Sequence, residues 1–336
     1  MRIAVPVSSG GPTWLAVAAA GRFVVAAGCA VAAAGRFVAA AGCAVAAAGC
    51  VVVAANCAPG AGGTAAPQVA AEFGSYWYRG LAEISRYELQ QARYGEIHSG
   101  DAVLIFVTED FLPDRQVKYE GHGSPAVAPV SVLKLNFTRR FDTGIYPYSA
   151  LTSVFAPVAG GAALKASSSV QEWCGHTYQQ LNLGDGGYRA VLHSYFQQEA
   201  DREVEIAGAI LEDELWTRLR LAPDALPLGE LRLVPGLQYA RFAHRPSRAE
   251  PAIAVLSPAE EDGTRVYGVR YRDFPRTLEI RFEAAFPHAI VGWEEHEGGA
   301  EPSRTTRARR THTMLTDYWN KNSVADASYR RQLGLD

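Results

Sequence analysis

One segment in the middle of the chain gathers side chains that could do chemistry. It holds Cys174 and His176 two residues apart, with His193, Tyr195 and Glu199 following. A thiol beside an imidazole can act as a nucleophilic pair, and Cys, His and Glu are all ligands that zinc accepts. Cys-x-His alone is a weak signal, so the meaning of this set depends on how the segment folds.

The dipeptide Asp185-Gly186 predicts a hairpin, because Asp-Gly favours a type I′ turn and aromatic-rich runs flank it. The opposed pairs are then Cys174 and Gln197, His176 and Tyr195, and Tyr178 and His193. Side chains alternate along a strand. We therefore expect a polar face with Glu172, Cys174, His176, His193, Tyr195 and Glu199. The core face would carry Trp173, Leu181, Leu183, Ala190, Leu192 and Phe196.

This polar face allows three interpretations. It can be a solvated or hydrogen-bonded surface, since His and Tyr often occupy the wet side of a sheet. It can line a ligand cavity on the concave side of a curved sheet. It can also be a metal or thiol site, in which His176, His193, Tyr195 and Glu199 would be ligands and Cys174 with His176 a catalytic pair. The first interpretation predicts that Cys174 is a small buried hydrophobe.

The usual catalytic and nucleotide signatures are missing from the sequence. It has no Walker loop, no dinucleotide fingerprint after a strand, no HExxH, no paired CxxC and no Gly-x-Ser-x-Gly. No cofactor is therefore expected.

The elements that would position these residues are mainly strands, from Tyr76 to Glu295. Four short runs are rich in β-branched and aromatic residues and bounded by turn formers: Leu104–Val107, Val132–Phe137, Val266–Tyr271 and Leu278–Phe282. Apolar and charged residues alternate in the last of them, which favours antiparallel sheet with one wet face.

One amphipathic helix is predicted at about 208–220. Its apolar positions, spaced by four, are Leu211, Leu215 and Leu219. Glu214 can pair with Arg218, and Pro223 stops the run. The expected fold is mainly β (α+β), a curved antiparallel sheet or half-barrel with one packed amphipathic helix. A Pro- and Gly-containing stretch at 223–236 would allow two subdomains within a body at 73–297.

The first 57 residues form an apolar, low-complexity N-terminus. Residues 16–29 are repeated almost unchanged at 30–43, and a shortened copy ends at Cys50. The segment before Cys50 has the layout of a secretory signal: Arg36 comes first, an apolar run follows, and small residues precede the cysteine. Two arginines interrupt the apolar run, so it does not reach the roughly 20 residues that a transmembrane helix needs.

The small residues before Cys50 resemble the lipobox of bacterial lipoproteins, which implies acylation of that cysteine. Cys57 is the reserve site, because it leads directly into a Gly- and Pro-rich flexible tether at 58–72. The expected location is the bacterial cell envelope, with the protein lipid-anchored to a membrane and its body in the periplasm or outside.

The net charge of the chain argues against one class of partner, nucleic acid. The chain of 336 residues carries a formal charge of −3, and removing the three arginines of the N-terminus takes it to −6. An acidic body has no electrostatic reason to bind nucleic acid. Beyond Glu297 the chain turns polar and basic, so residues 298–336 are predicted to be a polar linker and a tail that docks through Tyr318-Trp319.

Four segments resemble a family of uncharacterised bacterial envelope lipoproteins: Tyr76–Phe111, Ser168–His176, His193–Phe196 and Phe274–Glu294. Members sometimes carry the label "septum formation inhibitor Maf". Maf nucleotide pyrophosphatases have a Ser-x-Ser-x-Arg-Arg loop in an α/β fold, and this chain has no such loop after a first strand. The strand-rich plan is also similar to half-barrel folds that carry lipids or lipoproteins between membranes.

Three functions remain open. The leading one is a non-catalytic envelope lipoprotein that binds an apolar or amphiphilic ligand, or another envelope protein. The second is an enzyme or metal-binding protein that uses Cys174 and His176. The third is an envelope scaffold.

Overall fold

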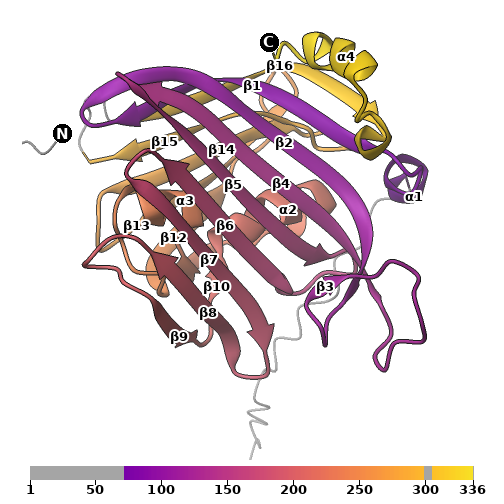
Figure 1. Ribbon diagram of the computed structural model, residues 1–336, viewed down its shortest axis with the longest axis horizontal. Coiled ribbons are helices and arrows are strands. Elements are labelled where there is room, and N and C mark those ends of the chain that lie inside the picture. The colour runs from indigo at the N-terminus through magenta and orange to yellow at the C-terminus, as the bar shows by residue number, and fades with distance from the viewer. Residues whose placement is uncertain (1–71, 299–304, 336) are drawn as a thin grey trace, which may run out of the picture. The chain divides into compact units, whose positions relative to one another are not determined.

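The computed structural model describes residues 72–298 and 305–335 (Figure 1). The predictions for residues 1–71, which concern the export segment, Cys50 or Cys57 as the lipidation site and most of the tether, lie outside the described residues.

A sheet of 16 strands dominates this part of the chain. The strands before the buried helix are β1 (Ala82–Arg93), β2 (Glu96–Leu112), β3 (Val117–Lys118), β4 (Val130–Thr143), β5 (Tyr146–Pro157), β6 (Lys165–Glu172), β7 (Gly175–Gly184), β8 (Gly187–Ser194), β9 (Arg202–Ile206) and β10 (Ile210–Leu211). Those after it are β11 (Gly229–Val234), β12 (Glu250–Leu256), β13 (Thr264–Tyr271), β14 (Arg276–Glu283), β15 (Ile290–Glu297) and β16 (Thr305–Thr316).

The spatial order of the strands is β10-β11-β12-β13-β14-β15-β16-β1-β2-β4-β5-β6-β7-β8-β9, with β3 beside β2. Neighbours are antiparallel except β10 and β11, which are parallel. The order begins at β10 and ends at β9, so the sheet is open. A mainly β fold with an open sheet confirms the fold class predicted from the strand pattern.

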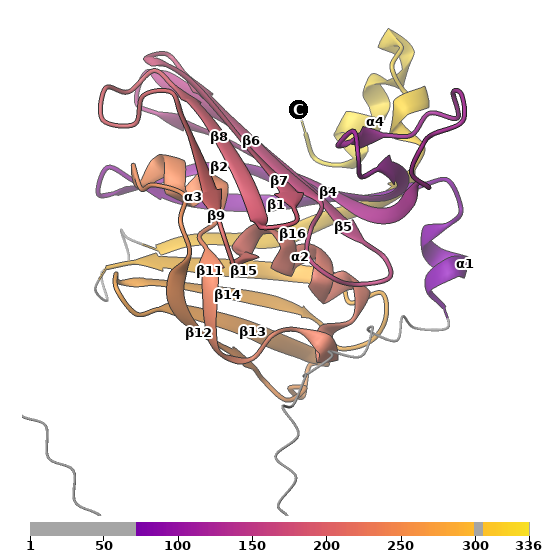
Figure 2. The same cartoon turned by 90° about the horizontal axis from the view of Figure 1, so that it is seen from below.

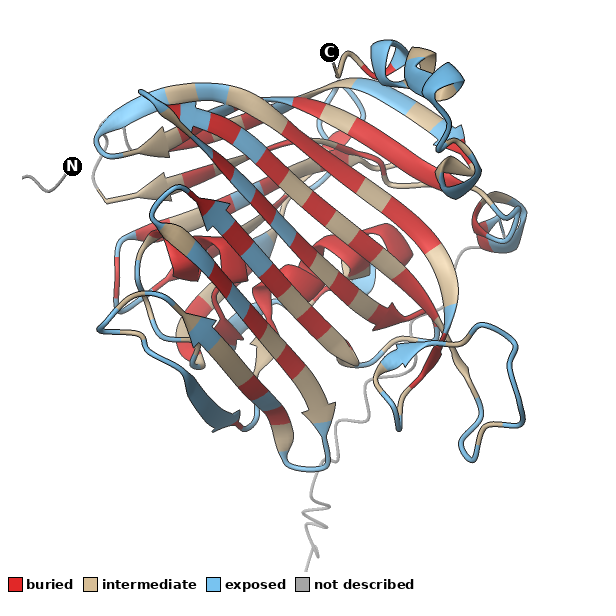
Figure 3. Ribbon diagram, in the orientation of Figure 1, coloured by how far each residue is buried: buried red, intermediate tan, exposed pale blue. Residues whose placement is uncertain are grey.

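In residues 72–298 and 305–335, seven short helical segments accompany the sheet: α1 (Phe73–Trp77), α2 (Glu212–Leu221), η1 (Pro223–Ala225), α3 (Leu237–Phe242), η3 (Tyr318–Asn320), η4 (Val324–Asp326) and α4 (Ala327–Gln332). Figure 2 shows α2 and α3 between the two halves of the sheet. Both helices are buried along most of their length (Figure 3).

The predicted helix is present as α2. Its apolar positions Leu211, Leu215 and Leu219 are all buried, and Arg218 pairs with Glu214 at 2.7 Å. The helix starts at Glu212 rather than at 208, because Ile210 and Leu211 form β10 and pair with β11.

Contacts across the interior show that the sheet folds over on itself. Phe137 of β4 and Trp293 of β15 have ring centroids 5.2 Å apart, although three strands separate β4 from β15 in the sheet order. Trp216 of α2 touches both rings. The space between the halves is therefore packed with side chains.

Ion pairs join α2 to the sheet inside this core. Arg276 of β14 binds Glu212 of α2 and lies 3.1 Å from Glu295 of β15. Arg220, at the other end of α2, binds Glu83 of β1 through two hydrogen bonds of 2.7 Å. Buried charges are tolerated when each has a partner, and removing one partner is strongly destabilising. These pairs fix α2 in place.

Two predictions about the organisation of the body were wrong, and a third was incomplete. The stretch at 223–236 does not separate two subdomains, because β11 lies within it and continues the sheet. The segment from 237 to 295 is rich in strands, as predicted, but it opens with the helix α3 at 237–242. Every residue of α3 is buried, so it shows no helical periodicity. Residues 305–316, expected to be a polar linker, form β16 in the middle of the sheet.

Candidate ligand-binding site

The predicted hairpin is present as β7 and β8, with the register that the Asp-Gly turn implies. Tyr178 pairs with His193, and Leu181 with Ala190. Leu181 and Ala190 are buried and His176 and His193 are exposed, as expected for the two faces. The hairpin ends earlier than predicted, since β8 stops at Ser194.

The other end of the predicted face is different, because the chain turns at Trp173-Cys174 between β6 and β7. This turn exposes Trp173, which was expected in the core, and buries Glu172, which was expected on the polar face. Cys174 is exposed, so its predicted burial was wrong. The carboxylate of Glu172 accepts a hydrogen bond of 2.5 Å from the Cys174 amide.

The polar side chains of this region form separate pairs instead of one cluster. His193 lies 3.3 Å from Asp201, and Glu199 lies 2.6 Å from His244. Tyr195 follows the end of β8 and packs against Gly175. In residues 72–298 and 305–335 no group of three or more His, Cys, Asp or Glu side chains is arranged to hold a metal ion.

The thiol of Cys174 is not activated in this arrangement. Its hydrogen bond to Glu172 and the negative charge of that carboxylate raise the pKa of Cys174. A thiolate nucleophile needs the opposite shift, toward or below neutral pH. The geometry therefore gives no support to Cys–His catalysis.

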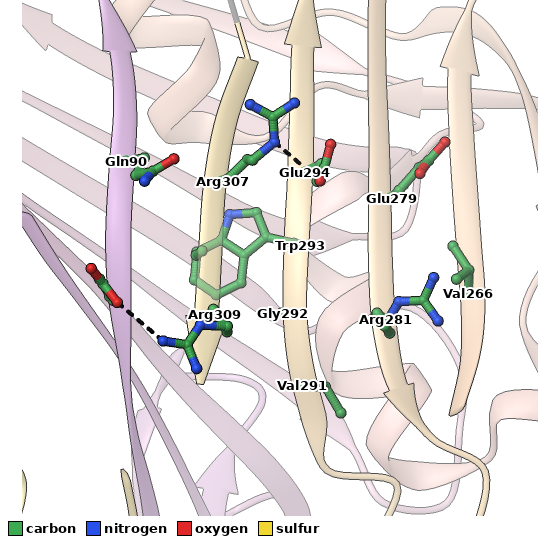
Figure 4. Close-up of a pocket in the computed structure, with 12 residues that line it drawn as sticks. Gln90, Val266, Glu279, Arg281, Val291, Gly292, Trp293, Glu294, Arg307 and Arg309 are labelled. Atoms are coloured by element: carbon green, nitrogen blue, oxygen red, sulfur yellow. Dashed lines mark hydrogen bonds and ion pairs between the residues drawn. The ribbon is translucent and has the colours of Figure 1, made fainter. Parts of the chain in front are cut away.

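Two grooves on the outer face of the sheet are better sites for a ligand. The larger one, here called the polar groove, has a volume of about 620 Å³ and crosses β13 to β16 and β1 (Figure 4). Its floor is flat at Gly292, where a Cβ would lie only 2.4 Å from the Ala308 carbonyl oxygen.

The charges of the polar groove neutralise one another. The Arg307 guanidinium donates to Glu294 at 3.2 Å, and the Arg309 guanidinium donates to Glu88 at 3.3 Å, as the dashed lines in Figure 4 show. These cross-strand pairs are partly exposed, and such pairs contribute little to stability. With its arginines occupied, the polar groove offers no excess charge to an ionic ligand.

The second groove, here called the apolar groove, has a volume of about 440 Å³ and lies between the sheet and the C-terminal segment. Its volume is within the range of about 300–1,000 Å³ that is typical of small-molecule sites. The apolar side chains that line it are Ile84, Val103, Ile105, Met314, Tyr318, Leu333 and Leu335. Leu333 is buried against Ile84 and Val103, so the C-terminal segment packs on the outer face of the sheet.

Charged side chains of both signs also line the apolar groove: Asp101, Arg140, Lys321, Asp326 and Arg330. Asp101 of β2 stands opposite Arg140 of β4 in the sheet register and accepts a hydrogen bond of 2.7 Å from Arg86 of β1. Arg330 of α4 lines the same groove. Among the residues that the structure describes, neither Arg140 nor Arg330 forms an ion pair. The groove thus combines an apolar floor with two guanidinium groups that are available to an anion.

Sequence reasoning missed this groove, although one signal was present. All four residues of Leu104–Val107 are apolar, and a strand that is apolar on both faces is covered on both faces. Leu104 and Phe106 face the core, while Val103, Ile105 and Val107 belong to the cluster beneath the C-terminal segment. The C-terminal segment packs on the sheet through Tyr318, Leu333 and Leu335, whereas Trp319, which was expected to dock as well, remains partly exposed.

Comparison with known proteins found one similar structure. No family model and no curated protein matches the sequence. The structure is similar to the crystal structure of the β-barrel-like protein of domain of unknown function DUF1849 from Brucella abortus. The identity is 11%, the TM-score is 0.43, and the match covers 70% of this chain and 98% of that chain. Within the described residues, no helix has the length and apolar character needed to cross a bilayer.

Proposed function

We propose that this chain is a non-catalytic binding protein of the bacterial envelope whose apolar groove takes an amphiphile with one acyl chain and an anionic head. The single observation that carries the proposal is the apolar groove with Arg140 and Arg330 at its border. The envelope location and the anchor at Cys50, with Cys57 in reserve, rest on the sequence of the N-terminus.

The interior of the folded sheet is a weaker alternative for this role. A carrier of the half-barrel type would hold its ligand on the concave side, but α2, α3 and their aromatic contacts occupy that side. Well-packed interiors leave few voids larger than a water molecule. The ligand is therefore placed on the outer face, under the C-terminal segment.

The apolar lining of the groove suits the acyl chain of such a ligand, and the two arginines suit its anionic head. Burial of a hydrocarbon chain against Ile105, Met314 and Leu335 contributes about 0.8 kcal/mol per CH₂ group. A carboxylate or phosphate head can accept hydrogen bonds from a guanidinium, and charge-assisted bonds of this kind are the stronger ones. Arg140 is exposed on β4, so it can reach a head group without a rearrangement of the core.

Photo-crosslinking of the full chain tests whether the amphiphile binds in the apolar groove. The labelled peptides identify the binding site directly, so the experiment can be done with membrane present. A palmitate analogue with a diazirine on its chain should label peptides from β2, β16 and the C-terminal segment, and unlabelled palmitate should compete. Arg140→Glu should weaken this labelling about tenfold, equivalent to roughly 1.4 kcal/mol.

Arg309→Glu is the matched control, because it reverses an exposed arginine in the polar groove. It should leave the labelling unchanged. A photoreactive fatty alcohol of the same length, which has no charge, should respond to neither substitution. Labels scattered over the surface, or equal effects of the two substitutions, would show that the groove is not the binding site.

A further inference from the structure

Four chain connections meet at one end of the sheet. The β1–β2 turn, the β4–β5 turn, the β6–β7 turn and the start of the β8–β9 loop lie side by side there, as the strand registers require. In Figure 1 the β1–β2 turn is at the left, whereas α1 and α4 are at the right.

Each of these connections exposes a large side chain. The exposed fractions are 62% for Tyr94, 80% for Ile145, 68% for Trp173 and 68% for Tyr195. Turns normally use Gly, Asn, Asp, Pro or Ser, so an Ile and a Trp at two tips are unusual choices. Scattered exposed apolar residues need no explanation, but contiguous ones mark interaction sites.

The exposed side chains are contiguous. The Tyr146 hydroxyl donates to the Tyr94 hydroxyl at 3.2 Å, and the Tyr146 ring lies 6.4 Å from the Trp173 ring. Tyr195 packs over Gly175, where a Cβ would lie 2.8 Å from its ring, so Tyr195 adjoins the Trp173 turn. We call Tyr94, Ile145, Tyr146, Trp173 and Tyr195 the aromatic rim.

Contacts beneath the aromatic rim hold part of it in place. The Tyr94 and Tyr148 hydroxyls are 2.7 Å apart, and the Arg93 guanidinium lies 4.4 Å from the centroid of the Tyr94 ring. Tyr148 is itself buried and stacks on Phe141. The rim is therefore supported by the core from below while its upper surface faces solvent.

We propose that the aromatic rim inserts into the interfacial region of a phospholipid bilayer. The rings of Trp and Tyr have an apolar body and a polar tip, and both residues are enriched at membrane–water interfaces. The rim consists of protruding tips, and a fluid lipid layer can surround such tips without a matching shape. Lipid is thus a better fit than a rigid protein partner, which would need a complementary hollow.

The charges near the rim indicate how it would bind. Glu96 and Asp142 are exposed beside the first two tips, and Arg202 is exposed beyond the fourth. This mixture gives no excess of positive charge, so attraction to anionic lipid, worth about 1 kcal/mol per basic residue near the surface, is not the driving force. Insertion should therefore occur in zwitterionic phosphatidylcholine and should not increase when anionic lipid is added.

A tether of the length predicted at 58–72 would let the rim reach a membrane that holds the predicted anchor. The structure begins at α1, at the opposite end of the strands from the rim. A strand of β1's length spans about 40 Å, and the 15 residues expected in the tether extend to at most about 50 Å. The insertion itself needs neither the apolar groove nor its ligand, so either proposal can fail without the other.

Tryptophan quenching in the full chain tests the insertion directly. Vesicles of phosphatidylcholine with brominated acyl chains quench only tryptophans that reach the lipid. Compared with unbrominated vesicles, they should quench part of the emission, and the quenching should be clearly smaller in Trp173→Phe; that difference is the Trp173-dependent quenching. Trp319→Phe is the matched control, since Trp319 is 44% exposed but lies in the C-terminal segment; it should leave the quenching unchanged. Trp14 is present in every variant, so the measurement is the difference between variants.

A second pair of variants tests the aliphatic tip. Ile145→Asp should reduce the Trp173-dependent quenching at least fivefold without a change in melting temperature, because Ile145 has no core contacts to lose. Val324→Asp, at a still more exposed site of the C-terminal segment, should have no effect. Quenching that is the same in Trp173→Phe and the unsubstituted chain, or that appears only with anionic lipid, would overturn the proposal.

Discussion

The indole of Trp216 on α2 packs edge-on against the indole of Trp293 on β15, with ring centroids 5.2 Å apart and planes at 89°. The same indole lies 5.1 Å from the ring of Phe137 on β4. One helical side chain therefore bridges the two halves of the folded sheet.

Trp216→Ala should lower the free energy of unfolding by about 3–5 kcal/mol, because it removes this bridge and leaves a cavity. Urea denaturation measures the change. Trp319→Ala, at a partly exposed site, should change it by less than about 0.5 kcal/mol. A loss of less than about 1 kcal/mol for Trp216→Ala would mean that the halves are held together elsewhere.

Asp213 should make the protein less stable as the pH rises. Burial raises the pKa of Asp213 to about 7, although the hydrogen bond that its carboxylate accepts from the Leu237 amide acts in the opposite direction. The pKa in the unfolded chain is about 3.9. The stability that the protonated form provides is present below pH 4 and is lost as the pH rises to 7.

The matched variant is Asp213→Asn, which keeps an oxygen to accept the Leu237 amide. Its free energy of unfolding should exceed that of the unsubstituted chain increasingly from pH 4 to pH 7, by roughly 2–4 kcal/mol in total. The difference should stay constant above pH 7. Denaturation curves at four pH values give the measurement, and a difference that does not vary with pH would refute the assignment.

Glu295 should have the opposite effect on stability: it should make the protein more stable as the pH rises from acid. Burial by itself would raise its pKa, but the positive charges of Arg139 and Arg276 outweigh burial and lower the pKa of Glu295 to about 2. The pairs therefore stabilise the fold above about pH 4.5, and this stabilisation is lost as the pH falls toward 2. Glu295→Gln should be less stable than the unsubstituted chain by about 3 kcal/mol at pH 6, with the gap closing in acid. A gap that persists at pH 2 would contradict this.

Cys174 should react slowly with iodoacetamide although it is exposed. Its hydrogen bond to Glu172 and the charge of Glu172 raise its pKa, so less thiolate is present at neutral pH. Peptide mapping by mass spectrometry follows the alkylation of this residue alone. Glu172→Gln should speed it up several-fold, whereas His176→Ala should not change it. Fast alkylation that requires His176 would restore the enzyme hypothesis.

Local patterns in the sequence predicted the parts of the fold that depend on local geometry. The four-residue spacing of leucines located α2, and Asp185-Gly186 set the register of β7 and β8. Glu172 is buried and Trp173 is exposed, which is the reverse of the prediction, because the chain turns at Trp173-Cys174. That turn contains no Gly, Asn, Asp or Pro at its two central positions, so nothing in the sequence marked it.

Features that depend on distant residues could not be predicted in this way. β16 points Thr306 and Ala308 toward the core, and two small side chains leave no alternation of apolar and polar residues. The apolar groove joins Ile84 and Val103 to Leu333, which are about 230–250 positions apart in the sequence. No local pattern links them, because the contact exists only once the sheet has formed.

The place of β16 in the sheet has a consequence for biosynthesis. The strands β1 to β9 form one half of the sheet, β10 to β15 form the other, and β16 alone joins them by pairing with both β15 and β1. Until the ribosome has released residues 305–316, the long edges of β1 and β15 have no partner, and unpaired edges recruit strands from other chains. A nascent or prematurely terminated chain is thus exposed to aggregation at the centre of its sheet, and a chaperone that shields these two edges would act at this stage.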